Sequence, residues 1–293
     1  MHKLKTALVA GALCATVLPG TAHAIVNGHD APRYEFMASI PETVPQLGNA
    51  KGVCGASLID PRWLVTAAHC VDPDGTGAVP DGIVRIGSDR RTSGGTVRTI
   101  DRVVRHPGYQ LGRPNQHDIA LVRLDRPVRE RPIRIAARAG EPGTPTRLLG
   151  FGTTFDTTDI TKAVFPERLQ QLETRRGAES ECSPGYASAD RLCTISRTPG
   201  AMACVGDSGG PQIQRGKHGR WELIGTTSGP GDTDKLCANG PGLYTNVPTH
   251  ADWIRATIRQ SGTANAASRG GNAARASAPA NHIPTTNADI ASR

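Results

Sequence analysis

The sequence predicts an all-β protein, a sandwich or a barrel, with one helix near its carboxyl end. Short β-type runs recur between residues 55 and 245, and Gly, Pro, Asp and Ser separate them at short intervals. Helical periodicity is convincing only within residues 251–260. At 293 residues, 37% of them hydrophobic, the chain is long and apolar enough for one or two folded domains.

The expected strands are short and rich in β-branched and aliphatic residues. In chain order they are Gly55–Ile59, Trp63–Val65, Ile83–Ile86, Val97–Val104, Ile119–Leu124, Arg147–Leu149, Trp221–Thr226 and Leu243–Thr245. A seam near residues 126–139, which contains Pro127 and Pro132, could divide these strands into two halves.

The expected helix is Ala251–Gln260, with Thr249 as its N-cap. Trp253, Ile254 and Ile258 form an apolar stripe at helical spacing. We expect this stripe to dock on the body of the protein rather than to bind a ligand.

The first 24 residues have the pattern of a secretory signal. Lys3 and Lys5 precede an apolar stretch, and Ala22 and Ala24 are small residues at the positions that a signal peptidase reads. A membrane anchor is the alternative, but about 13 apolar residues are too few for a span that needs about 20. We therefore expect a secreted, extracellular protein without a membrane partner.

Residues 260–293 are expected to form a disordered, low-complexity tail. Small and polar residues dominate, and Ile283 and Ile290 are the only large apolar side chains from residue 261 onward. Such a segment cannot bury enough apolar surface to offset its ordering entropy. A tail that binds a cell wall or a partner is the alternative.

The net charge and the cysteine count change when the expected signal and the expected tail are set aside. The formal charge of +8 falls to +4 for residues 25–259, because each end carries a net charge of two. Of the seven cysteines, Cys14 belongs to the signal. The six that remain favour three disulfides in an exported protein: Cys54, Cys70, Cys182, Cys193, Cys204 and Cys237.

An arginine-rich segment at residues 123–138 could indicate nucleic-acid binding. However, no aromatic residues are interleaved with its six arginines, and no nucleic-acid-binding module is evident around them. A solvated linker is the better interpretation, so we expect no nucleic-acid partner.

The strongest chemical motif is the run Gly-Asp-Ser-Gly-Gly-Pro at Gly206–Pro211. Flanking glycines can expose the Ser208 hydroxyl on a tight turn, and the amides of Gly206 and Ser208 can converge on a developing oxyanion. A glycine-rich turn without chemistry is the alternative.

A nucleophilic serine needs a base, and two further motifs could supply a catalytic pair. His69 follows an apolar run and precedes a cysteine, and Asp118 stands at the head of another apolar run. Ser228 could donate a hydrogen bond to a buried Asp118. Each residue alone could be structural, but together they indicate nucleophilic catalysis.

With these motifs the sequence resembles the trypsin/chymotrypsin family of serine endopeptidases across residues 25–259. The landmarks are Ile25–Gly28, Thr66–Cys70, Asp118–Leu121, Gly206–Pro211 and Pro241–Tyr244, and the order His, Asp, Ser is that of this family. The resemblance implies two antiparallel six-stranded β-barrels with a C-terminal helix and the site between them. It also implies that His69 is the general base, that Asp118 orients it, and that Ser208 forms the acyl-enzyme.

The resemblance further implies the disulfides Cys54–Cys70, Cys182–Cys193 and Cys204–Cys237, and a reaction that needs no metal or organic cofactor. The family's calcium loop has no matching acidic set, and Asp72, Asp74 and Asp81 are interpreted as solvated turn residues. Activation in the family pairs a new amino terminus with the aspartate before the serine, here Ile25 with Asp207. Signal cleavage after Ala24 would produce Ile25 directly.

The expected specificity pocket departs from that of trypsins. Met202, six residues before Ser208, takes the place of the aspartate found in enzymes that cleave after Arg or Lys, and a thioether suits an apolar residue. After Ser228 the family normally has Trp-Gly, whereas this chain has Gly229 and Pro230, and proline has no amide hydrogen to donate to a substrate strand. Gly242 matches a small residue of the pocket wall.

The sequence thus predicts a monomeric protease acting on peptides or proteins, which a proteinaceous inhibitor could also bind. An esterase or peptidase of restricted specificity, and a binding or adhesion module without turnover, are the alternatives. The complete set of three catalytic residues argues against the last. An excess of 28 arginines over 6 lysines suggests a bacterial, GC-rich source.

Overall fold

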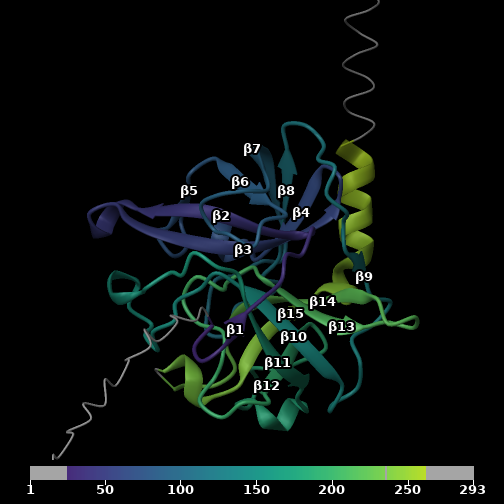
Figure 1. The fold of residues 1–293 in the computed structure, drawn as a ribbon. Helices are drawn as coiled ribbons and strands as arrows, with labels where there is room; N and C mark the ends of the chain where they lie inside the picture. The colour runs from purple at the N-terminus through teal and green to yellow at the C-terminus, as the bar shows by residue number, and fades with distance from the viewer. Residues whose placement is uncertain (1–24, 235, 262–293) are drawn as a thin grey trace, which may run out of the picture.

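The computed structural model describes residues 25–234 and 236–261, which form two closed six-stranded β-barrels and a C-terminal helix at 251–261 (Figure 1). The predicted all-β class with two barrels is confirmed. The predicted signal, and the tail from residue 262 onward, lie outside the described residues. No helix in the described ranges is both long and apolar enough to cross a membrane.

The first barrel is built from the amino-terminal half of the chain. Its strand order is β3-β4-β8-β7-β6-β2, and pairing of β2 with β3 closes the ring. Short β5 adds to β2. The bounds are β2 Met37–Val44, β3 Ala50–Asp60, β4 Trp63–Thr66, β5 Val79–Pro80, β6 Ile83–Ile86, β7 Thr96–Arg105 and β8 Ala120–Leu124.

The second barrel has the order β11-β10-β13-β14-β15-β12, closed by β11 against β12. Two short strands lie outside this ring: β1 pairs with β11, and β9 runs parallel to β14. Residues 125–133 connect the barrels and overlap the expected seam at 126–139. The bounds are β1 His29–Asp30, β9 Arg134–Ile135, β10 Pro145–Gly150, β11 Gln170–Arg176, β12 Arg191–Ser196, β13 Pro211–Arg215, β14 Trp221–Pro230 and β15 Gly242–Asn246.

The interior of the second barrel is partly polar. The Gln212 side-chain amide donates to the hydroxyls of Thr146 at 3.2 Å and Thr194 at 2.9 Å. The hydroxyls of Thr146 and Thr174 lie 2.7 Å apart. These buried groups offset part of each other's desolvation cost. Consequently β11, β12 and β13 carry no apolar run that reveals a strand in the sequence.

The C-terminal helix docks as predicted: Ile254 is buried, and Trp253 and Ile258 pack against the main apolar core. The predicted N-cap is wrong. Thr249 lies in the 3-10 turn η6, and its hydroxyl donates to the Asn246 carbonyl at 2.7 Å. The helix also includes residue 261, one residue beyond the expected end at Gln260.

The described part of the chain contains six short 3-10 turns. They are η1 Pro45–Leu47, η2 Ala68–Val71, η3 Ile160–Lys162, η4 Glu179–Glu181, η5 Cys237–Asn239 and η6 Val247–His250. Next to η2, Asp72 is buried and accepts a hydrogen bond from the Arg105 guanidinium, so its interpretation as a solvated turn residue is wrong. Asp74 is exposed, as expected.

The barrels meet in a close backbone contact beside Ser208. The Gly55 amide on β3 donates to the Ser208 carbonyl at 2.7 Å. A Cβ atom at Gly55 would lie 2.6 Å from the Gly210 Cα, closer than two carbons can approach. Glycine at both positions therefore allows the first barrel to hold the serine loop of the second.

Candidate active site

The centre of the site is the buried carboxylate of Asp118, just before β8, with 1% of its surface exposed. One oxygen, Oδ2, lies 2.7 Å from the His69 Nδ1 and accepts the Ser228 hydroxyl at 2.6 Å. It also accepts the Asn115 side-chain amide at 3.0 Å. Oδ1 accepts the backbone amide of His69, also at 3.0 Å. Four donors thus surround one carboxylate.

These contacts set the protonation of the pair. Burial by itself raises the pKa of Asp118, but the charge and hydrogen bond of His69 and the Ser228 hydroxyl lower it overall. Burial by itself lowers the pKa of His69, but the Asp118 charge and hydrogen bond raise it above its ordinary value. The pair is therefore an anion that holds an imidazole which readily accepts a proton.

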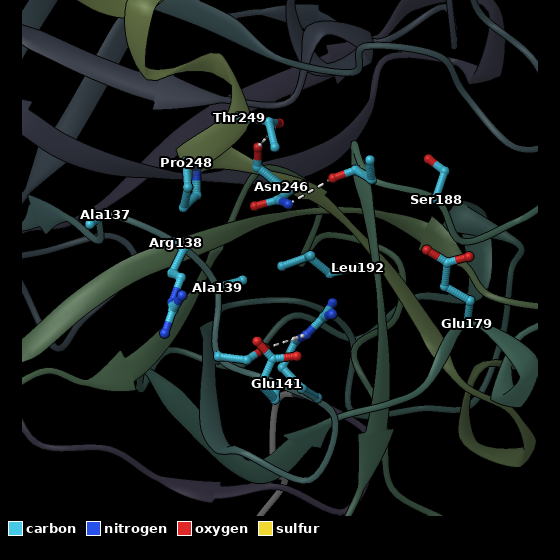
Figure 2. A pocket seen from close by; sticks show the side chains of 13 residues that line it. Ala137, Arg138, Ala139, Glu141, Glu179, Ser188, Leu192, Asn246, Pro248 and Thr249 are labelled. Carbon is cyan, nitrogen blue, oxygen red and sulfur yellow. Dashed lines mark hydrogen bonds between the residues drawn. The ribbon is translucent and has the colours of Figure 1, made fainter.

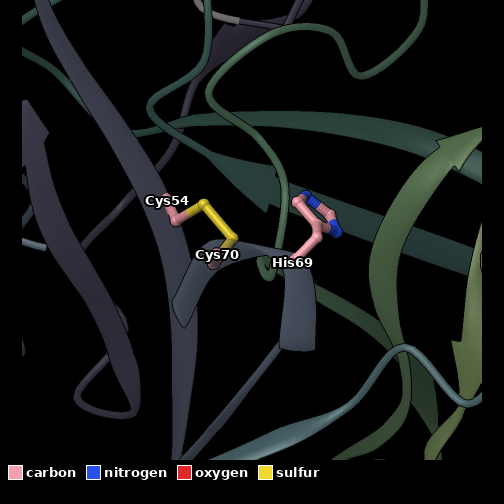
Figure 3. A group of neighbouring side chains, drawn as sticks. All are labelled: Cys54, His69 and Cys70. Carbon is pink, nitrogen blue, oxygen red and sulfur yellow. A yellow bond between two sulfur atoms is a disulfide. The ribbon is translucent and has the colours of Figure 1, made fainter. Parts of the chain in front are cut away.

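Local structure fixes the position of His69. The residue lies in η2 directly after β4, and the neighbouring Cys70 is bonded to Cys54 on β3 (Figure 3). Both sulfurs are consumed by this disulfide, so the cluster of the two cysteines with His69 offers no thiolate to a metal ion. The structure also pairs Cys182 with Cys193 and Cys204 with Cys237, the pairings that the resemblance implies.

The loop that carries Ser208 depends on its glycines. Gly206 has a φ of 93° and Gly209 a φ of 76°, both in the region that favours glycine. Among the described residues, the backbone amides of Gly206 and Ser208 donate to no acceptor, whereas the Gly209 amide donates to Thr227 at 2.8 Å. Two free amides on one tight turn are available to an incoming oxygen.

Ser208 is brought to the same place as His69 by the backbone. A Cβ at Gly209 would lie 2.2 Å from the Thr66 hydroxyl oxygen and 3.1 Å from the Ala67 amide, so the serine loop packs directly against the segment that leads to His69. Within the described residues the Ser208 hydroxyl makes no hydrogen bond to His69. Such bonds are often long without substrate.

The residues of the expected specificity pocket also gather. Met202 is 2% exposed, and a Cβ at Gly242 would lie 3.1 Å from its sulfur. Pro230 is exposed and pairs with Gly242 in the β14–β15 ladder. A Cβ on Gly229 would meet no atom within 4 Å, so there is open space where the family normally has tryptophan.

Figure 2 shows a separate hollow on the second barrel, with a volume of about 270 Å³. Asn246, Thr249 and Glu141 are among its lining residues, and the Asn246 side chain donates to the Ala189 carbonyl at 2.7 Å. None of His69, Asp118 and Ser208 lines this hollow, so it does not belong to the site described above.

Sequence reasoning missed three residues around the site. Asn115 contacts Asp118, and the Thr245 hydroxyl donates to the Asp118 carbonyl at 2.8 Å. Glu42 on β2 is 4% exposed, and when its carboxyl is ionised it raises the pKa of His69. Burial in turn raises the pKa of Glu42 to about 8. Asn115 could have been suspected from its place three residues before Asp118, whereas Glu42 and Thr245 lie on distant strands.

Comparison with known proteins identifies the family. The family model named Trypsin matches residues 25–254. The chain belongs to the trypsin family. Kallikrein-14 of Homo sapiens is 30% identical over 269 residues, covering 88% of this chain and 93% of the relative. Trypsin II-P29 of Gallus gallus is 32% identical over 257 residues, covering 83% and 94%.

The fold comparison agrees with the sequence comparison. A solved structure of neuropsin, a serine protease expressed in the limbic system of mouse brain, superposes with a TM-score of 0.65 at 25% identity, covering 80% of this chain and 100% of that structure. The chain is therefore a serine endopeptidase. The relatives named here are animal proteins, so the bacterial source expected from composition stays a prediction.

The buried Glu42 carboxyl predicts a pH-dependent cost to stability. Its pKa is about 8 in the folded chain against 4.5 when exposed, so folding loses stability as pH rises from about 4.5 to about 8. Glu42→Gln should remove this loss and raise the Tm at about pH 9 by about 5 °C or more, with no difference at about pH 4. Thermal unfolding across pH tests this. Glu141→Gln, at an exposed position, is the control and should leave the Tm unchanged at both pH values. Equal Tm values for Glu42→Gln and the parent chain at about pH 9 would contradict the prediction.

Proposed function

We propose that this endopeptidase is secreted and cleaves peptide bonds through an acyl-enzyme on Ser208, with His69 as general base and Asp118 as the residue that orients it. The observation that carries this assignment is the pair of hydrogen bonds from the His69 ring and amide to the Asp118 carboxylate, 2.7 and 3.0 Å long. They hold Nδ1–H toward the carboxylate, so Nε2 keeps a lone pair for a proton.

In this proposal His69 takes the proton of the Ser208 hydroxyl as its oxygen attacks the scissile carbonyl carbon. The imidazolium that forms is stabilised by Asp118 and then protonates the leaving amine. Water, deprotonated by the same ring, later hydrolyses the acyl-enzyme. The free amides of Gly206 and Ser208 support the oxyanion of each tetrahedral intermediate.

The assignment of Ser208, His69 and Asp118 predicts a different loss of activity for Ser208→Ala than for Asp118→Asn. Ser208→Ala removes the nucleophile, so labelling by a fluorophosphonate and hydrolysis of peptide amides should both disappear. Asp118→Asn should lower kcat by roughly 10⁴-fold. It should also move the acid limb of the pH–rate profile to lower pH, because the Asp118 charge raises the pKa of His69.

Asp252→Asn is the matched control, since the Asp252 side chain is 98% exposed, and this variant should keep full activity. Fluorophosphonate labelling that persists in Ser208→Ala would place the nucleophile elsewhere. Absence of labelling and turnover in the wild type would favour the alternative of a binding or adhesion module.

We further propose that the residue before the scissile bond is apolar. Met202 supplies no charge for a basic side chain, and it packs in a buried apolar cluster with Ala201 and Tyr244. Gly229 leaves space beside the pocket mouth, and Pro230 can donate no amide hydrogen to a substrate strand. Recognition would then depend more on the pocket than on extended backbone pairing.

The specificity proposal predicts faster cleavage of leucyl and phenylalanyl amides than of arginyl amides, measured as kcat/KM on matched peptide substrates. Met202→Asp should shift this ratio toward arginine by 10-fold or more, because a buried carboxylate gains a cationic partner. Met202→Leu is the control and should keep the apolar preference. Rapid arginyl cleavage by the wild type, with little leucyl or phenylalanyl cleavage, would overturn the proposal.

We also propose that a free amine at Ile25 activates the enzyme by pairing with Asp207. Ile25 is fully buried, and the next amide, of Val26, donates to the Met202 carbonyl at 3.1 Å. Burial raises the pKa of Asp207 to about 7 despite amide donors from Cys204 and Gly152. A cation beside this carboxyl would lower that pKa. The φ of Ile25 is 58°, unfavourable for a β-branched residue within a chain but without meaning at an amino terminus.

A chain that begins at Ile25 should be active, and one that begins at Ala24 should lose at least 100-fold in kcat/KM, because the added residue removes the charge from Ile25. Activity should also fall at high pH as the amine loses its proton. Amino-terminal sequencing of secreted protein should give Ile-Val-Asn-Gly. A different terminus, or equal activity of the two chains, would contradict this mode of activation.

Secretion is supported by the signal pattern at residues 1–24 and by three disulfides, which persist in oxidising compartments. We propose peptide or protein substrates, a monomeric enzyme, and a cleft that a proteinaceous inhibitor could occupy. A restricted esterase or peptidase is the second candidate, because a Gly229–Pro230 departure that weakened substrate pairing would narrow the range of substrates.

A further inference from the structure

The hollow on the second barrel is formed by four segments that are far apart in the sequence (Figure 2). They are the loop between β9 and β10, the end of β11 with the start of η4, the segment that leads into β12, and the end of β15 with η6. The volume of about 270 Å³ is just below the range of about 300–1,000 Å³ that is usual for ligand pockets. The hollow therefore suits a small ligand or the end of a chain.

Arg176, the last residue of β11, brings a partly buried positive charge to the hollow. Its Nε donates to the Gly140 carbonyl at 3.1 Å. Among the described residues, its two Nη groups donate to no acceptor and form no ion pair. Burial lowers the pKa of Arg176, and the charges of Glu141 and Glu179 offset only part of that effect. This guanidinium has lost water without gaining a close counter-ion, so it is available to an anion.

Three further charged side chains lie at exposed positions around the hollow. They are Arg138, Glu141 and Glu179, and Figure 2 shows Arg138 and Glu179 on opposite sides of Leu192. Together with Arg176 they make two cations and two anions, so the hollow has no net charge. A single carboxylate can pair with the guanidiniums, whereas a dianion such as phosphate would be repelled by both glutamates. The charges therefore favour a monoanion.

Asn246, at the end of β15, supplies a hydrogen-bond acceptor to the wall of the hollow. Its side-chain nitrogen donates to the Ala189 carbonyl at 2.7 Å, which fixes the orientation of the amide. Its Oδ1 is buried and has no donor among the described residues. A buried acceptor costs free energy until a donor pairs with it, so a ligand that brings an N–H group gains affinity there.

The surface between the charged groups is apolar. Leu192 on β12 is 2% exposed, and Ala139 and Pro248 also line the hollow. Apolar side chains gain free energy by leaving water for such a surface. A matching ligand thus combines one carboxylate, one N–H group and one apolar side chain. The carboxyl-terminal residue of a peptide carries all three on a single Cα atom.

We propose that this hollow binds the carboxyl-terminal residue of a peptide. Arg176 and Arg138 pair with its carboxylate. The Asn246 Oδ1 accepts its N–H, and Leu192 contacts its apolar side chain. Hydrolysis of a peptide bond converts an internal residue into a new carboxyl-terminal one, so the hollow recognises cleavage products of an endopeptidase and not the intact internal segments from which they come.

Isothermal titration of the full chain carrying Ser208→Ala, which prevents the proposed turnover, tests this site. N-acetyl-alanyl-leucine should bind at one site with a Kd of about 1 mM or tighter. The corresponding leucinamide should bind at least about 10-fold more weakly, because it lacks the charge that pairs with the guanidiniums. The N-methylleucine analogue should also lose about 3-fold or more, because it has no N–H for Asn246. Equal affinity of the acid and the amide, or no binding of the acid, would overturn the proposal.

Variants of the two arginines locate the binding. Arg176→Gln should weaken binding of the acid by about 10-fold or more and remove its preference over the amide, which a loss of packing alone would not do. Arg138→Gln changes an exposed side chain and should weaken binding of the acid by about 3-fold. Arg102→Gln, exposed and outside the hollow, is the control and should leave binding unchanged. A preference for the acid that stays the same in both the Arg176 and Arg138 variants, as a product bound at the catalytic residues would give, would contradict the assignment.

Discussion

The buried carboxylate of Asp118 is the constraint on which the rest of the site depends. An ionised carboxylate loses its hydration in the interior, and its burial is tolerable only when donors replace the lost water. Here the donors come from both barrels, with His69 and Asn115 on the first and Ser228 on β14 of the second. Satisfying one charge thus fixes the two barrels relative to each other and holds His69 in one orientation.

Sequence patterns predict the fold well where strands are apolar and poorly where the barrel interior is polar. β4 and β8 are mostly aliphatic and buried, and β14 contains the buried pair Leu223–Ile224, so each of these strands is recognisable in the sequence. In contrast, β11 reads Gln-Gln-Leu-Glu-Thr-Arg-Arg, with Gln170 and Thr174 fully buried. Its polar side chains face inward because partners such as Thr146 come from other strands, and a single sequence does not show those partners.

The same distinction applies to the site. His69, Asp118 and Ser208 stand in local motifs, so their residue types and neighbours reveal them. Glu42 has no such motif: it becomes notable only because β2 buries it where its carboxyl, when ionised, acts on His69. The residues that line the hollow on the second barrel are separated by up to 112 positions, and only the closed topology brings them together. Sequence motifs thus predict functional residues within one loop, whereas residues that meet from distant loops can be identified only when the fold is known.

Asp118 and Asp207 show that the surroundings of a buried carboxyl group decide whether its pKa is raised or lowered. Both are 1% exposed. Asp118 has a histidine and three further donors, and its pKa is lowered, whereas Asp207 has two backbone amides, and burial raises its pKa to about 7. Two neutral donors therefore do not offset desolvation, while an imidazole partner does. Asp207 is an acceptor for a cation that the described side chains do not supply. Asp207 precedes Ser208 in the chain, so the proposed pairing of Asp207 with a free Ile25 amine would act on the loop that carries the proposed nucleophile.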